Sequence, residues 1–268
     1  MLQRQPRFQP APPVALPLDV RLMNGVAGGV FVLAGAALLA AGLGWVSRLP
    51  LFTLKAVQIE GDLTRNSVNT LRANAVPALQ GNFFSLKLQD SRAAFESVPW
   101  VRQAVVRRVW PDRLRVRLEE HRPAALWVNE DGNDRLVNSF GEVFEANVGD
   151  VEDEALPRFA GPEGSAGQML ALFQRLQPVL GGLEMNITHL ALSGRGSWRA
   201  ELDSGATLEL GRGSDDEVLA RTERFARTLG QLTARYRAPL LHADLRHTEG
   251  YAVRLRGVTT LHNNKSIN

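Results

Sequence analysis

A long uncharged run near the N-terminus is the strongest hydrophobic pattern in the chain. Residues 25–46, GVAGGVFVLAGAALLAAGLGWV, carry no charged and no strongly polar side chain. A helix rises about 1.5 Å per residue, so a run of this length spans roughly 30 Å, the thickness of bilayer hydrocarbon. Trp45 suits the lipid–water interface. The pattern predicts a transmembrane helix over residues 25–47, preceded by a tail over residues 1–24.

A cleaved signal peptide is the alternative interpretation of this run. Signal peptides combine a short basic leader with an apolar stretch of about 7–15 residues. Here the leader is longer and contains several prolines, and the apolar run exceeds that length, so the sequence favours an uncleaved anchor. Basic residues lie on both sides of the run, which makes the positive-inside bias weak. The short tail and the bulky region on the other side favour a cytoplasmic N-terminus.

Residues 54–122 begin with a strand pattern followed by two helical patterns. Leu54–Glu60 alternates between two faces, which predicts a short strand. Thr64 is placed to cap a helix whose apolar residues recur at helical spacing. Asp90 is placed to cap a second short helix, which we expect to end before Pro99 because proline interrupts helical hydrogen bonding.

Two further strands complete this region. Residues 101–110 lead through a Pro-Asp turn into residues 113–119, which alternate strictly between charged and apolar side chains. Leu114, Val116 and Leu118 are therefore expected to face a core and the intervening arginines to face water. The order strand, helix, helix, strand, strand predicts a small three-stranded sheet with two helices on one face.

Residues 124–257 predict a larger mixed α/β domain with a mostly antiparallel sheet, giving the soluble part an α+β class. The capping box from Ser214 to Glu217 predicts the start of a long helix, and residues 169–180 form a second apolar helix. Residues 258–268 read as a polar tail. The expected strands cover residues 126–128, 135–137, 141–144, 189–192, 198–202, 206–210, 240–247 and 251–256.

Several longer motifs follow one another along both regions. The first region contains VQIEG, NFFSL and VPWVRQAVVRRVWPDRLRVRLEEHRPAALW, and the second contains LVNSFGEVFEA, ALSGRGSWRAEL, LELGRG and HADLRHTEGYAVRL. The first set resembles a POTRA domain of the type found in the FtsQ/DivIB family of bacterial division proteins. The second set is similar to that family's C-terminal domain in order and spacing. The resemblance implies a POTRA domain over residues 54–122 directly after a single membrane anchor.

Composition excludes several other classes of function. Net charge is only +3 and the basic residues alternate with acidic ones, which argues against a nucleic-acid surface. Cysteine is absent, so neither disulfides nor Cys-ligated zinc can form. The loop Gly211–Gly213 could hold a phosphate, but Asp215 and Asp216 would repel it and favour a capping role. We found no catalytic motif, and we predict no catalytic, cofactor-binding or metal-binding residue and no small-molecule substrate.

The last expected strand has no successor and so is expected at a sheet edge, where its outer backbone groups are unpaired. Such an edge can accept a partner segment as an added strand, or it can merely be kept soluble by charged residues. The family resemblance implies docking of FtsB, itself paired with FtsL, at this edge. The partner-binding residues predicted on this basis are Arg195, Arg246, His247, Glu249, Gly250, Tyr251, Val253 and Leu255.

The resemblance therefore implies a non-enzymatic scaffold of the divisome in the inner membrane, with periplasmic domains, at the division septum. Two alternatives come from other classes. POTRA domains also occur in components of outer-membrane protein assembly or transport, although those usually carry a membrane barrel behind the domain. A membrane-tethered cell-wall enzyme is the other alternative, which the missing catalytic motifs disfavour.

Overall fold

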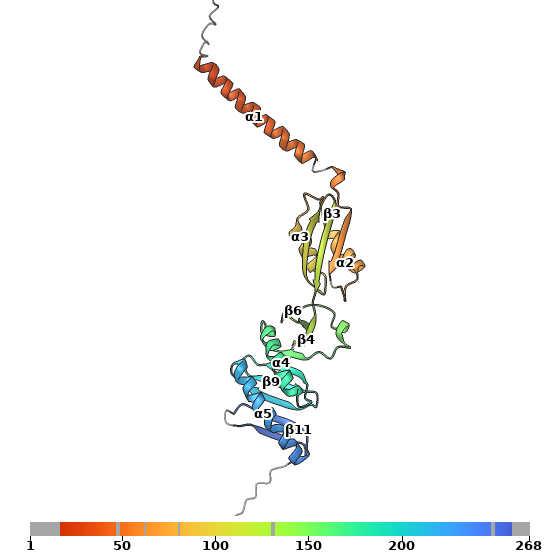
Figure 1. Cartoon of the computed structure of the whole chain (residues 1–268), viewed down its shortest axis with the longest axis vertical. Helices are drawn as coiled ribbons and strands as arrows, with labels where there is room; N and C mark the ends of the chain where they lie inside the picture. Colours follow the sequence, from red (N-terminus) through yellow and green to blue (C-terminus); the bar gives the residue numbers. More distant parts are fainter. Residues whose placement is uncertain are drawn as a thin grey trace, which may run out of the picture.

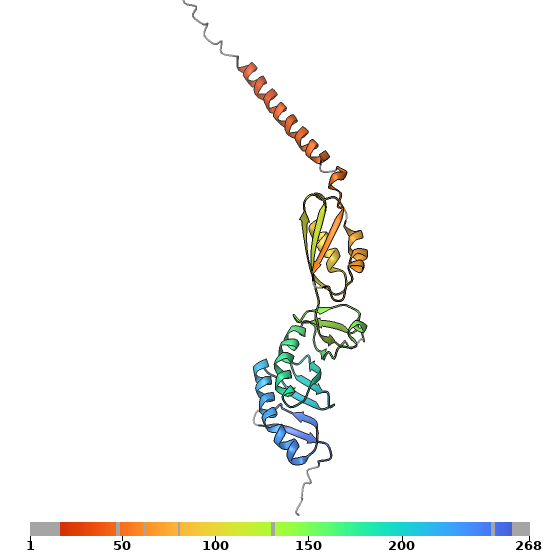
Figure 2. The same cartoon turned by 45° about the vertical axis from the view of Figure 1, so that its right-hand side comes forward.

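An apolar helix, a small three-stranded domain and a larger nine-stranded domain follow one another along the long axis of the molecule (Figure 1). A computed structural model of the chain describes residues 17–46, 49–61, 63–79, 81–129, 132–247 and 250–258. The helix lies at one end of this elongated arrangement and the last strands of the larger domain lie near the other end, as a second view confirms (Figure 2).

Helix α1 spans Leu18–Val46, so it begins within the predicted tail and contains the whole apolar run. Its mean hydropathy reaches 2.2 over an 18-residue window, and none of that window is buried inside the protein. A helix of this length and composition can cross a bilayer. This fits a protein with a single membrane span, as the sequence predicts.

The three-stranded domain has the predicted order of elements. Strand β3 lies between the other two, parallel to β1 and antiparallel to β2. Every second residue of β3 is buried, so one face of the sheet packs on the helices while its arginines face water, as predicted. The elements are the short 3-10 turns η1 (Pro50–Phe52) and η2 (Val76–Ala78), the helices α2 (Val68–Ala75) and α3 (Leu88–Glu96), and the strands β1 (Ala56–Gly61), β2 (Val101–Val109) and β3 (Arg113–Glu120).

Both predicted helix caps in this domain are wrong. Ser67 caps α2, because its side chain accepts the N–H of Thr70. Thr64 instead donates its own N–H to the carboxylate of Glu120, at 2.7 Å. It therefore lies in a segment that is hydrogen-bonded to the end of β3. Asp90 lies inside the first turn of α3, where a carboxylate still favours the helix N-terminus.

The larger domain is built on one nine-stranded sheet in the order β12-β11-β10-β9-β8-β7-β4-β5-β6. Five of its strand pairs are antiparallel and three are parallel, which confirms the predicted mixed, mostly antiparallel sheet. The strands are β4 (Pro123–Trp127), β5 (Arg135–Asn138), β6 (Val143–Phe144), β7 (Arg158–Ala160), β8 (Ile187–Leu192), β9 (Trp198–Leu202), β10 (Thr207–Gly211), β11 (Leu240–Asp244) and β12 (Ala252–Leu255).

Helices α4 (Ala166–Gly181) and α5 (Asp215–Tyr236) pack against this sheet and against each other. Their apolar residues share one continuous core with the buried residues of the strands. The predicted capping box is confirmed, since the Glu217 carboxylate accepts the N–H of Ser214 at 2.8 Å and the Ser214 hydroxyl accepts the N–H of Glu217 at 3.3 Å. A short 3-10 turn, η3 (Val148–Val151), lies beside the domain junction.

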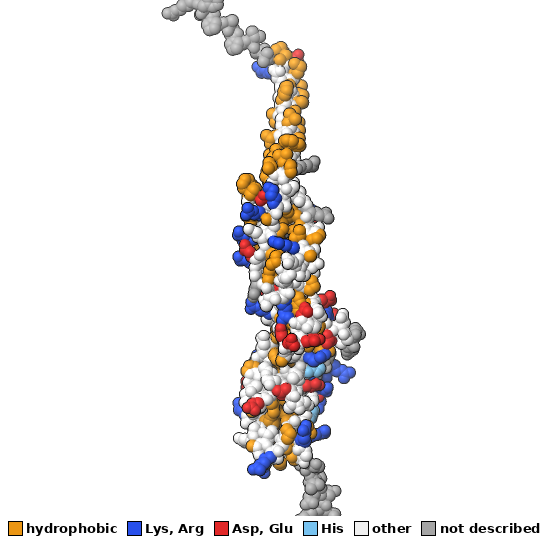
Figure 3. Space-filling model, turned by 90° about the vertical axis from the view of Figure 1, so that its right-hand side faces the viewer, with side chains coloured by type: hydrophobic (Ala, Val, Ile, Leu, Met, Phe, Trp, Pro, Cys, Tyr) orange, Lys and Arg blue, Asp and Glu red, His pale blue; other side chains and the backbone are white. Residues whose placement is uncertain are grey.

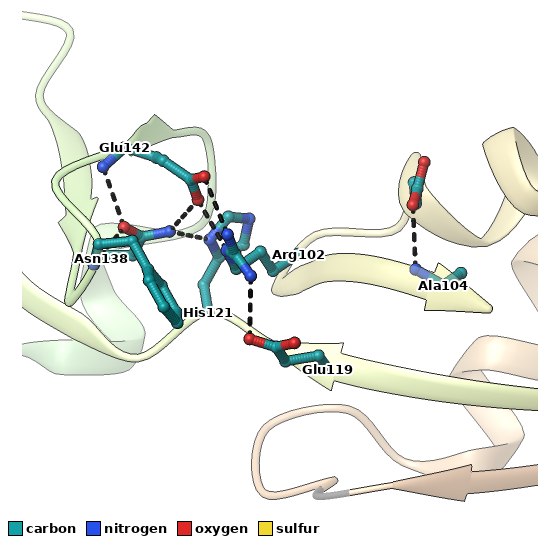
Figure 4. Close-up of polar contacts among 8 residues, drawn as sticks. Arg102, Ala104, Glu119, His121, Asn138 and Glu142 are labelled. Atoms are coloured by element: carbon teal, nitrogen blue, oxygen red, sulfur yellow. Dashed lines mark hydrogen bonds and ion pairs between the residues drawn. The ribbon is translucent and has the colours of Figure 1, made fainter.

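The two domains are joined by a two-residue link between β3 and β4 and by a polar network across the junction (Figure 4). Arg102 on β2 bonds Glu142 at 2.8 Å and Glu119 at 3.0 Å. The Arg102 guanidinium, helped by the Asn138 amide, lowers the pKa of Glu142 to about 2. The link residue His121 stacks on Phe144, and burial lowers the pKa of its imidazole.

Candidate partner-binding site

Strand β12 forms one edge of the nine-stranded sheet, as the sequence predicts. It pairs antiparallel with β11, and its other side has no neighbouring strand among the described residues. Strand β11 in turn lies parallel to β10. An edge strand of this kind presents a row of unpaired N–H and C=O groups that can template another strand.

The direction of the backbone groups on β12 follows from one hydrogen bond at its end. Arg256 donates its N–H to the carbonyl of Pro239 at 3.0 Å, so its amide points toward β11. Successive backbone groups of a strand point to alternate sides, so Arg254 and Ala252 also face β11. The N–H of Leu255 and both backbone groups of Val253 therefore face the open edge.

The side chains on β12 alternate between the core and solvent. Tyr251, Val253 and Leu255 face the core, and Leu255 is only 5% exposed. Leu255 therefore supports the sheet, and its side chain is not free to contact a partner. The ring of Tyr251 meets Phe225 of α5 edge-to-face at 5.2 Å between centroids, while its hydroxyl is hydrogen-bonded to Thr228.

A pocket of about 310 Å³ opens between α5 and the segment that leads into β12. It is strongly basic on the helix side and is closed by Tyr251 on the strand side. Arg221 is fixed there by hydrogen bonds to the carbonyls of Leu210 and Arg212, at 3.2 and 2.6 Å. The lining residues are Arg221, Arg224, Arg227, Thr228, Leu245, His247, Gly250 and Tyr251.

The three pocket arginines are the functional candidates that the sequence prediction missed. Nothing in the sequence indicates that these side chains of α5 come close to β12. Their spacing of three residues puts them on one stripe of α5, and this is the only signal that the sequence carried. His247, Gly250 and Tyr251 were predicted, and the structure brings them to the same pocket.

Arg246 is held by a carboxylate next to it. Its guanidinium bonds Asp244 through two nitrogens at 2.6 and 2.9 Å, and its N–H bonds the same carboxylate at 3.0 Å. These hydrogen bonds lower the pKa of Asp244 to about 2. Gly211, with φ of 83°, lies directly under Arg246, and a Cβ there would come within 3.0 Å of the Arg246 side chain. Asp244 and Arg246 thus form a salt bridge at the end of β11.

Arg195 lies apart from the other predicted residues. It is exposed in the turn between β8 and β9, at the same end of the sheet as Asp244 and Ala252. Three strand spacings of about 4.8 Å separate β12 from β9, so Arg195 lies roughly 14 Å or more from the edge. A partner that touches both must extend across this end of the sheet. Glu249 lies outside the described residues.

The arrangement combines an open backbone edge with a basic pocket beside it. A segment pairing with β12 would place its neighbouring side chains over that pocket, where an acidic group would be attracted. Among the residues described, no group of three or more His, Asp or Glu side chains is arranged to hold a metal ion. The geometry favours binding of a peptide segment.

Two family models match the chain over most of its soluble part. The model described as "POTRA domain, FtsQ-type" matches residues 52–121. The model described as "Cell division protein FtsQ/DivIB, C-terminal" matches residues 125–246. Together they match the three-stranded domain and the larger domain as far as residue 246, before β12, in the order predicted from the sequence motifs.

Curated relatives are similar over nearly the whole chain. A protein named "Cell division protein FtsQ" from Thiomonas arsenitoxydans is 37% identical over 96% of this chain and 94% of its own length. The protein of the same name from Burkholderia pseudomallei is 38% identical over 91% and 96%. That from Bordetella pertussis is 39% identical over 88% and 92%.

Proposed function

The chain belongs to the FtsQ/DivIB family of cell division proteins, and on that premise we propose that it is a non-enzymatic scaffold of the divisome that recruits FtsB and FtsL. The proposed mechanism is addition of a partner strand to β12, assisted by charge complementarity, with no bond made or broken. By gathering these partners the protein would organise septal peptidoglycan synthesis.

The observation that carries this proposal is the open edge of β12 beside a basic pocket. Val253 directs its backbone groups to that edge, and Tyr251 connects the strand to the pocket through its contacts with α5. A partner strand would gain main-chain hydrogen bonds from the edge and specificity from side chains that reach the pocket. Arg246 and Arg195 would extend the basic surface toward acidic groups of the partner.

The proposed orientation follows from α1 and from the sizes of the parts on either side of it. A short N-terminal tail in the cytoplasm leaves both domains in the periplasm of the inner membrane. There the scaffold would act at the division septum. The outer-membrane alternative loses its support because the C-terminal domain matches the division family's own model.

A charge-reversal pair on α5 tests the role of the pocket. We would reconstitute the full chain in lipid nanodiscs and titrate it with soluble FtsB and FtsL segments. Arg227→Glu changes the charge of the pocket, whereas Arg235→Glu makes the same change on the same helix, about 12 Å along its axis at 1.5 Å per residue. We expect at least several-fold weaker binding for the first variant and nearly unchanged binding for the second.

Either of two results would overturn the proposal. If the wild-type chain failed to bind the segments under conditions in which they are folded, the recruitment role would be wrong. If both variants bound like the wild type at low ionic strength, the pocket would have no part in recognition, because a charge reversal at a contact site changes the association rate and its salt dependence.

A further inference from the structure

Three segments far apart in the sequence meet at the end of the POTRA domain that faces α1. They are η1, the turn at residues 82–86 and the connection between β2 and β3. Phe83 donates its N–H to the carbonyl of Phe52 at 2.9 Å, which ties the turn to η1. Lys55 donates its N–H to the carbonyl of Asp112 at 2.9 Å, which ties the connection between the strands to the start of β1.

This end, which we call the membrane-facing tip, exposes large apolar side chains. Trp110 is 75% exposed, Leu51 is 67% exposed and Phe84 is 51% exposed. Phe84 also packs edge-to-face on Phe52 and Phe83, with centroids 4.9 and 5.3 Å away, so it is held in a defined position. Water-exposed aromatic and aliphatic groups gathered on one small surface indicate a contact with something apolar.

Basic side chains surround these apolar groups. Lys55, Lys87 and Arg113 lie at the tip, where Asp112 pairs with Lys55 at 3.1 Å and Asp90 lies 4.0 Å from Lys87. The cations exceed the anions here, and Figure 3 shows Lys and Arg side chains beside hydrophobic ones at this end of the domain. Aromatic and cationic groups side by side match the headgroup region of a bilayer with anionic lipids.

The chain itself brings this surface to a membrane. Only residues 47–49 separate the end of α1 from η1, and Leu49 still donates its N–H to Val46 at 3.1 Å. Three residues reach at most about 11 Å, so the start of η1, and with it Leu51 and the segments tied to η1, is kept close to the membrane surface next to the span. A surface held so close to the bilayer meets lipid before it meets a protein partner.

We propose that the membrane-facing tip inserts into the lipid headgroup interface of the membrane that α1 crosses, with Trp110, Phe84 and Leu51 as apolar anchors and the surrounding cations on anionic headgroups. The domain would then stand on the bilayer in a fixed orientation. This inference rests on α1 spanning a membrane and is independent of partner docking at β12.

Depth measurement on the full chain tests this contact. The chain has no cysteine, so Phe84→Cys introduces a single site for a nitroxide spin label. The labelled protein is placed in nanodiscs of phosphatidylethanolamine and phosphatidylglycerol. Collision with oxygen, which partitions into lipid, is compared with collision with a water-soluble nickel chelate. Gln103→Cys is the matched control, because it is exposed on the same domain, seven residues and about 23 Å along β2 from Trp110.

We expect the ratio of oxygen to nickel accessibility to be several-fold higher at position 84 than at position 103. Adding Trp110→Ser and Arg113→Ser to the position 84 protein should bring the ratio down toward the control, while the spectrum of the label at position 103 stays unchanged if the domain is folded. Nanodiscs of phosphatidylcholine alone should lower the ratio in part. Equal ratios at both positions would overturn the proposal, as would protection of position 84 from both reagents, which would indicate a protein contact.

Discussion

Proline at position 253 tests the inferred direction of the backbone on β12. The N–H of Val253 faces the open edge, so proline there leaves the pairing with β11 intact and is tolerated on an edge strand. An added strand would lose one hydrogen bond, worth about 0.5–1.5 kcal/mol net, and would bury an unpaired carbonyl at about 1–3 kcal/mol. A total of about 1.5–4.5 kcal/mol corresponds to roughly 10- to 2000-fold weaker binding.

The assay is a binding isotherm of the full chain in nanodiscs with soluble FtsB and FtsL segments, beside a thermal unfolding curve of each variant. Val253→Ala is the matched control, because it also removes the side chain but keeps the N–H. We expect Val253→Ala to bind within a few-fold of the wild type. Arg254→Pro should lower the unfolding temperature clearly more than Val253→Pro, because its N–H faces β11.

Two outcomes would refute this reasoning. Binding of a folded Val253→Pro variant with the wild-type dissociation constant would exclude strand addition at that position. A Val253→Pro variant that unfolds more readily than Arg254→Pro would show that the two backbone directions are assigned the wrong way round.

Three further predictions concern carboxylates. Arg246→Gln should raise the pKa of Asp244 from about 2 toward 3.8, measured by NMR titration of the carboxyl carbon; an unchanged pKa would mean that another group holds it down. Glu120→Gln should lower the free energy of unfolding by about 2–4 kcal/mol in urea, because this buried carboxylate accepts three backbone N–H groups; a loss near zero would contradict that role. The pKa of Glu142 is depressed, so its pairing with Arg102 should add modestly to the free energy of unfolding. This contribution should be complete above about pH 4.5 and should be lost as pH falls toward 2. Arg102→Met should flatten this part of the plot of unfolding free energy against pH.

The sequence predicted those elements whose signal is local. Strand β3 alternates between apolar and basic residues from Arg113 to Leu118, so its buried face was evident. The start of α5 was evident from a capping box within four residues. Strand β7 was missed, because it has three residues with one buried side chain, Phe159, and exists by parallel pairing with β4 and β8, which are distant in sequence. The predicted cap at Thr64 was wrong for a similar reason, because the carboxylate that accepts its N–H belongs to Glu120, 56 residues away in the sequence.

In the partner-binding site, too, the sequence predicted the features that depend on local pattern and missed those that depend on long-range packing. The edge position of β12 was expected, and the structure confirms it among the described residues. The inward orientation of Leu255 and the pocket under Tyr251 depend on how α5 crosses the sheet, which no local pattern specifies. Family resemblance supplied the predicted residues near β12 but not the arginine stripe on the helix that faces them.

The junction between the domains determines how far the membrane-facing tip lies from the partner-binding edge at β12. Two residues connect β3 to β4, and Trp100 donates its indole N–H to Asp150 at 3.0 Å across the junction, while Arg102 bonds Glu142. The short link and these polar contacts between the two domains resist bending at the junction. The distance from the membrane-facing tip to β12 is therefore fixed by the structure of the two domains (Figure 1). A partner anchored in the same membrane then gains effective concentration at β12 only if its own linker matches that distance. Loosening the junction should therefore weaken recruitment of membrane-anchored partners while leaving binding of free segments unchanged.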